Sequence, residues 1–112
     1  MNDKLENLRA YIEAYNDTAS NDGNALNENL KLITIELSYL EPIRADFKHK
    51  FESLVYELTK DKKMTVARAV NEAETKYPEL YLLRRVIDNA YRICDAIRTN
   101  ISFLKSERQN YN

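Results

Sequence analysis

The sequence has few of the residues on which turn-rich folds depend. Its 112 residues include one glycine and two prolines, where average composition would give about eight and six. A β-sandwich or barrel needs these residues at its many tight turns, so the composition argues against both and favours helices. A chain of this length holds one domain. We therefore expect a single all-α domain over residues 1–112.

Long apolar runs and paired cysteines are also missing. No apolar stretch approaches the ~20 residues of a membrane span, and the first residues mix both charges instead of placing a basic region before an apolar one. We expect neither a signal peptide nor a membrane anchor. The single cysteine, Cys94, cannot form an internal disulfide, which fits a reducing compartment. The expected location is the cytoplasm.

Combinations that carry catalysis or bind metal are scarce. Cys94 lies on an apolar helical seam, where a thiol behaves as a small hydrophobe, and His49 is the only histidine. Asp46 and His49 are one helical turn apart but supply only two metal ligands. One glycine is too few for a phosphate-binding glycine-rich loop. We expect no enzyme activity, no metal site and no cofactor.

Apolar residues recur at spacings of three and four in the first half of the chain. Residues Asp3–Tyr15 form one amphipathic helix, and the polar stretch Asn16–Asn24 is typical of a flexible loop. A heptad seam from Leu26 to Leu58 predicts a long helix. Pro42 should kink or break this helix, and the pattern leaves open whether one bent helix or two helices result.

The second half contains a polar connector, a short helix and a long final helix. Thr65 is placed to cap the short helix, which ends at Tyr77–Pro78. Eight successive a and d positions of the final helix are apolar: Leu80, Leu83, Ile87, Ala90, Cys94, Ile97, Ile101 and Leu104. We expect an elongated antiparallel hairpin or bundle with coiled-coil-like packing, in which residues 1–24 hold the N-terminal helix and loop and residues 25–108 the helical core.

Apolar residues outside the two seams predict self-association. Two long helices in so short a chain expose much apolar surface unless a neighbouring copy covers it. We therefore expect a homo-oligomer. The contacts between copies are predicted at Leu32, Ile35, Val86, Ile93 and Phe103.

The net charge of -1 hides an asymmetry along the chain. Residues 1–46 carry nine acids and four bases, whereas residues 47–112 carry nine acids and thirteen bases. Cations can follow phosphates and tyrosine rings can stack on unpaired bases, a combination used by proteins that bind single strands. The predicted nucleic-acid-binding residues are Lys48, Lys50, Tyr56, Lys60, Lys62, Lys63, Arg68, Arg84, Tyr91, Arg92 and Arg98. A solvated or protein-facing surface is the alternative, because Asp88 and Asp95 can neutralise part of the final helix.

The segments FESLVYELTKDKKMT (51–65) and LYLLRRVIDNAYRICDAIRTNISFLKSER (80–108) resemble the UvsY-type recombination mediators of tailed phages. The resemblance is architectural, covers about residues 26–108 and includes no signature motif. It lies in a helical half, a basic connector with aromatic residues, and a long final helix with Cys94-Asp95-Ala96-Ile97-Arg98 and a charged end. The acidic first half departs from the family pattern.

The resemblance implies a protein of the phage-infected or bacterial cytoplasm that binds single-stranded DNA. It also implies displacement of the single-strand binding protein and loading of a RecA-class recombinase by a ring-like oligomer. By position, the family's DNA contacts fall on Lys48, Lys50, Lys60, Lys62 and Lys63. The alternative is a small phage or mobile-element protein that inhibits a host protein, through a helical face or by mimicking nucleic acid with its acidic half.

Overall fold

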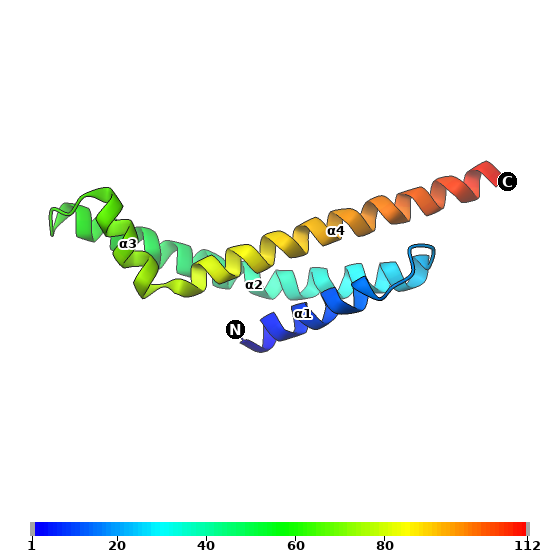
Figure 1. Ribbon diagram of the computed structural model, residues 1–112, viewed down its shortest axis with the longest axis horizontal. Helices are drawn as coiled ribbons and strands as arrows, with labels where there is room; N and C mark the ends of the chain where they lie inside the picture. Colours follow the sequence, from blue (N-terminus) through cyan, green and yellow to red (C-terminus); the bar gives the residue numbers. More distant parts are fainter. Residues whose placement is uncertain (1, 112) are drawn as a thin grey trace.

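A computed structural model describes residues 2–111 and contains four helices (Figure 1): α1 (Asn2–Asn16), α2 (Gly23–Lys60), α3 (Val66–Lys76) and α4 (Pro78–Tyr111). No strand occurs among these residues. The two long helices α2 and α4 lie antiparallel, which gives a rod of 68 × 27 × 18 Å. The all-α prediction is confirmed. Within residues 2–111, no helix combines the length and apolarity needed to cross a bilayer.

Side-chain caps set the starts of the inner helices. The Asp22 carboxylate accepts a hydrogen bond from the Ala25 amide at 3.1 Å at the start of α2. The Thr65 hydroxyl accepts one from the Arg68 amide at the start of α3, as the sequence predicts. These caps satisfy amides that have no partner within the helix. Both helix starts are therefore encoded locally.

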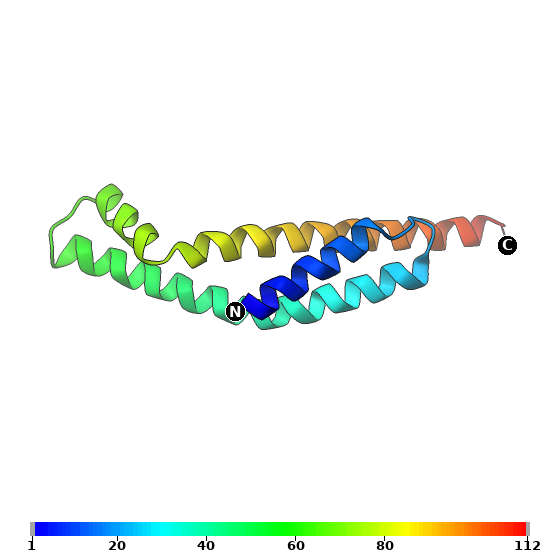
Figure 2. The ribbon, with the colours of Figure 1, turned by 60° about the horizontal axis from the view of Figure 1, so that its bottom comes forward.

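Pro42 lies inside α2, which remains one helix and bends near its middle (Figures 1 and 2). Proline lacks the amide that would bond to the Ser38 carbonyl, and its ring crowds the preceding turn, so the helix bends there. This settles the question left open by the sequence in favour of one bent helix. The first half of α2 packs with α1 and α4, and the end of α2 packs with α3.

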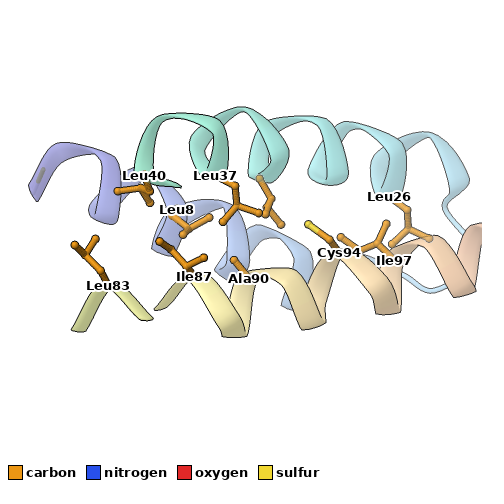
Figure 3. Close-up of a cluster of buried hydrophobic side chains, with 10 residues drawn as sticks. Leu8, Leu26, Leu37, Leu40, Leu83, Ile87, Ala90, Cys94 and Ile97 are labelled. Atoms are coloured by element: carbon orange, nitrogen blue, oxygen red, sulfur yellow. The ribbon is translucent and has the colours of Figure 1, made fainter. Parts of the chain in front are cut away.

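The core lies between the two predicted seams (Figure 3). All six seam positions of α4 from Leu80 to Ile97 are 2% exposed or less. The main buried cluster consists of Leu8, Leu26, Ile33, Leu37, Leu40, Leu83, Ile87, Ala90, Cys94 and Ile97. Ile101 and Leu104 are only half-buried, where α4 continues past the start of α2. The predicted seam of α4 is thus confirmed, and its burial weakens toward the C-terminal end.

Helix α1 packs on both long helices and shares their core through Leu8 (Figure 2). The loop after it is shorter than the predicted Asn16–Asn24, because both ends of that stretch belong to helices. The loop is also tied down: the Thr18 hydroxyl donates to the Ala14 carbonyl at 2.7 Å and accepts from the Asn29 amide at 2.8 Å. The expected flexible loop is therefore anchored to α2.

Part of the apolar surface expected between copies is used within the chain. Val86 and Ile93 are half-buried and pack against the main cluster, and Val86 also lines the groove between α1 and α4. Leu32 is half-buried as well. The core takes up part of the surface of Val86 and Ile93, so less of these two side chains than predicted is free to meet a second copy. Ile35 and Phe103 remain 40% and 60% exposed and are still candidates for a contact between copies.

Candidate nucleic-acid interface

All eleven residues predicted to bind nucleic acid lie on the surface. They do not form one site. Tyr56, Lys60, Lys62 and Lys63 gather where α2 ends, at one end of the rod, with Arg68 at the start of α3. Lys48 and Lys50 lie further back on α2, and the others are spread along α4: Arg84, Tyr91, Arg92 and Arg98. At 1.5 Å per residue the α4 group alone spans about 21 Å.

We call the end of the rod that carries Tyr56, Lys60, Lys62 and Lys63 the basic tip. Its backbone is held in a closed turn, since the Met64 amide donates to the Leu58 carbonyl at 3.1 Å. Lys63 adopts a φ of 55°, in the left-handed region that costs a residue with a Cβ about 1 kcal/mol. The Lys60 ammonium donates to the Tyr56 hydroxyl at 2.9 Å, and the tyrosine ring is 62% exposed. The tip thus presents an exposed aromatic ring beside three exposed lysines.

Ion pairs reduce the free charge of some predicted residues. Lys48 pairs with Glu52 at 3.9 Å, and Lys50 pairs with Asp46 at 3.1 Å. On α4, Arg98 pairs with Asp95 at 3.3 Å, as the sequence suggested. Such exposed pairs are worth at most about 1 kcal/mol and break readily for a stronger partner. In the part of the chain that the structure describes, the three tip lysines form no ion pair.

A polar cluster joins α2 to α4 beside the Pro42 bend. Arg44 places one nitrogen 2.8 and 2.9 Å from the two Glu41 oxygens and another 3.3 Å from Asp88. The Tyr91 hydroxyl donates to Glu41 at 2.9 Å. Arg44, the one polar residue in the seam of α2, therefore has an interhelical partner. Tyr91 is 41% exposed, but the bond to Glu41 fixes its ring, which limits its ability to stack on a base.

The Glu41 carboxylate raises the pKa of Tyr91, mainly because the neutral hydroxyl is its hydrogen-bond donor. Above pH 10.0, the value for a free tyrosine, the unfolded chain loses this proton while the folded chain still holds it. The stabilisation is complete below that pH and is lost as the pH rises through the higher folded value. Tyr91→Phe should lower the free energy of unfolding by at most about 1 kcal/mol at neutral pH.

The difference in free energy of unfolding between Tyr91→Phe and the parent protein should become smaller well above pH 10.0. Urea denaturation of both proteins at each pH measures it. Tyr81→Phe is the matched control on the same helix, because Tyr81 is 69% exposed and its hydroxyl has no partner among the described residues. A deficit that is the same at both pH values would contradict the role given to the Glu41 bond.

The two residues considered for chemistry have ordinary environments. Cys94 is buried at 1% exposure within the core, and this burial raises the pKa of its thiol. A thiol of this kind is a poor nucleophile. His49 is exposed on α2. The burial of Cys94 agrees with the place on the apolar seam that the sequence predicts for it.

The fold also brings together cations that sequence reasoning did not combine. Arg9 of α1 and Arg85 and Arg92 of α4 line one groove between these helices. Helical periodicity places Arg85 and Arg92 on one column of α4, but no local signal shows that α1 will pack beside that column. Arg9 was therefore missed, and its position depends on tertiary packing.

The antiparallel return of α4 weakens the charge asymmetry seen along the sequence. Arg98 of α4 lies beside Glu41 in the first half of α2, and Lys105 and Arg108 lie beside Asp22 at its start. The basic first half of α4 likewise lies beside the middle of α2, where Glu41 and Asp46 are found. In space the molecule is a weaker dipole than its sequence suggests, so local cation groups matter more than the overall split.

Comparison of the chain with known protein families, with curated proteins and with solved structures found no match.

Proposed function

We propose that the protein binds single-stranded DNA with little sequence preference and acts as a recombination mediator that helps to load a RecA-class recombinase. The basic tip carries this proposal. Three lysines without an ion pair and an exposed tyrosine ring lie together there on a closed turn. Lysines of this kind neutralise phosphates and release counterions, and an exposed ring offers a stacking surface to any base.

The mediator role rests on the resemblance to UvsY-type proteins and on the rod shape. A rod with binding residues at one end suits an assembly in which several copies present their tips to one strand, because linked weak sites bind with a higher effective concentration. Ile35 and Phe103 are the exposed apolar residues proposed to join copies. The proposed partners are single-stranded DNA, the recombinase and further copies of this chain, in the cytoplasm of a phage-infected or bacterial cell.

A variant of the basic tip tests the binding. Lys60→Ala, Lys62→Ala and Lys63→Gly are combined, with glycine at the third position because Lys63 has a positive φ that glycine adopts without strain. The variant should bind a labelled oligothymidylate at least tenfold more weakly at low salt. The slope of log affinity against log salt should fall by about 2, since each lost phosphate contact on a single strand removes about 0.7. Fluorescence anisotropy at several salt concentrations measures both.

The matched control replaces three exposed lysines outside the tip, Lys31, Lys76 and Lys105, by alanine. It removes the same formal charge, so long-range attraction falls equally while the tip stays intact. The proposal predicts that the control keeps most of the salt slope. The assignment of the basic tip as the DNA site would be wrong if the parent protein did not bind at low salt. It would also be wrong if the two triple variants had equal salt slopes.

A second candidate is inhibition of a host nucleic-acid-binding protein. It is favoured by six exposed acids on α1, the following loop and the start of α2: Asp3, Glu6, Glu13, Asp17, Asp22 and Glu28. Carboxylates on a helical rod can mimic the phosphates of a duplex. If the parent protein fails to bind DNA at low salt, this candidate takes precedence.

A further inference from the structure

Helices α1 and α4 leave an open groove of about 860 Å³ between them. One wall comes from α1, with Arg9 and Glu13, and the other from α4, whose polar residues are Arg85, Asp88, Asn89 and Arg92. Its remaining lining is apolar and comes from Leu5, Ile12, Leu82 and Val86. The groove therefore combines convergent arginines from two helices with apolar side chains between them.

The arginines of the groove have free hydrogen-bonding capacity. Arg9, Arg85 and Arg92 are exposed, and none forms an ion pair with a residue that the structure describes. On α4, Asp88 of the groove lining is bonded to Arg44 of α2, and Asp95, the acid closest in sequence to Arg92, is paired with Arg98. Glu13 is the only other acid in the lining. The groove is therefore net positive, with three guanidinium groups available to an anion.

We infer that this groove binds the phosphodiester backbone of a single-stranded nucleic acid, with α1 as part of the site; the inference rests on the proposed function. Guanidinium groups bind phosphate in a bidentate manner, and their planes also stack on bases. Arg85 and Arg92 are two turns apart, about 10 Å along α4, so they contact separate phosphates. The apolar residues between them offer unpaired bases a surface that excludes water.

The groove and the basic tip are close enough for one nucleic-acid strand to contact both. Asp88, in the groove lining, contacts Arg44, and Lys60 follows Arg44 by about 24 Å along α2. A strand stacked as in a duplex, at 3.4 Å per nucleotide, covers that distance in about seven nucleotides, and an unstacked strand covers it in fewer. Short oligomers should therefore engage one site and longer ones both, with a steeper salt dependence.

The test combines Arg9→Ala, Arg85→Ala and Arg92→Ala and measures binding of labelled oligothymidylates of about 5 and about 20 nucleotides. For the longer oligomer, the salt slope should fall by about 2 relative to the parent protein. The matched variant with lysine at the same three positions should keep most of the slope, because it keeps the charge. Circular dichroism of each variant verifies that α1 and α4 remain helical.

The outcomes separate this inference from the proposed function. If the arginine variant binds like the parent protein while the tip variant loses affinity, the groove is not a DNA site and the proposed function stands. If the parent protein binds no DNA, both fall. If polyglutamate displaces the long oligomer as well as polyphosphate does at equal charge, the groove binds acidic protein segments and the assignment to nucleic acid is overturned.

Ultraviolet cross-linking of the parent protein to the long oligothymidylate provides a measurement without any substitution. Mass spectrometry of the cross-linked peptides should find thymidine on α1 between residues 5 and 13, beside α4 peptides that include Arg85 or Arg92. Cross-links confined to the basic tip would overturn the inference even if an arginine variant were to fold poorly.

Discussion

Replacing Ile87 by alanine should lower the free energy of unfolding by about 2 to 5 kcal/mol. Ile87 is 0% exposed at the centre of the cluster shown in Figure 3, where α4 faces Leu37 and Leu40 of α2 and Leu8 of α1. Truncation removes apolar contacts from all three helices and leaves a cavity that neighbouring side chains fill only in part. Equilibrium urea denaturation followed by circular dichroism measures the loss.

Leu82→Ala is the control on the same helix. Leu82 is 46% exposed, so its truncation should cost about 1 kcal/mol or less. Losses of similar size for the two variants would mean that α4 does not bury the seam that contains Ile87.

Replacing Glu36 by leucine should raise the free energy of unfolding by about 1 to 3 kcal/mol. Glu36 is 5% exposed, and its Oε2 atom is buried without a hydrogen-bond partner in residues 2–111. It lies on the side of α2 that also carries Asn29, whose amide reaches the loop after α1. A buried polar atom without a partner loses its hydration without compensation, and leucine removes that penalty while filling a similar volume.

Glu28→Leu provides the comparison for Glu36→Leu. It makes the same chemical change at an exposed position of α2, where the effect should stay within about 0.5 kcal/mol. Destabilisation by Glu36→Leu would show that the carboxylate has a partner in solution and that its burial is compensated.

The long-range order of the helices follows from local patterns in the sequence. The unbroken a and d positions from Leu80 to Ile97 could face only another apolar seam, and the short connectors required an antiparallel return. Thr65 and Pro78 marked helix boundaries through their own backbone chemistry. The pattern could not decide whether Pro42 bends the helix or ends it. An internal proline costs ~3 kcal/mol, and the sequence does not show how much packing on either side of it offsets that cost.

Features that depend on a third helix could not be predicted. Val86 and Ile93 are apolar positions beside the α4 seam, and the pattern does not distinguish cover by α1 from cover by a second copy. The same applies to Arg9, whose place in the groove depends on how α1 crosses α4. For the candidate site, exposure of each cation could be predicted, but which cations lie together could not.

The two parts of the rod on either side of the bend at Pro42 differ in how much apolar surface they bury. On one side, branched side chains of three helices interlock, whereas near the basic tip α3 contributes Ala69 and Ala73 as its buried residues. Small side chains bury less apolar area, so transient opening costs less free energy around α3 than in the middle of the rod. We therefore expect the basic tip to change conformation more readily than the middle of the rod when it binds a partner.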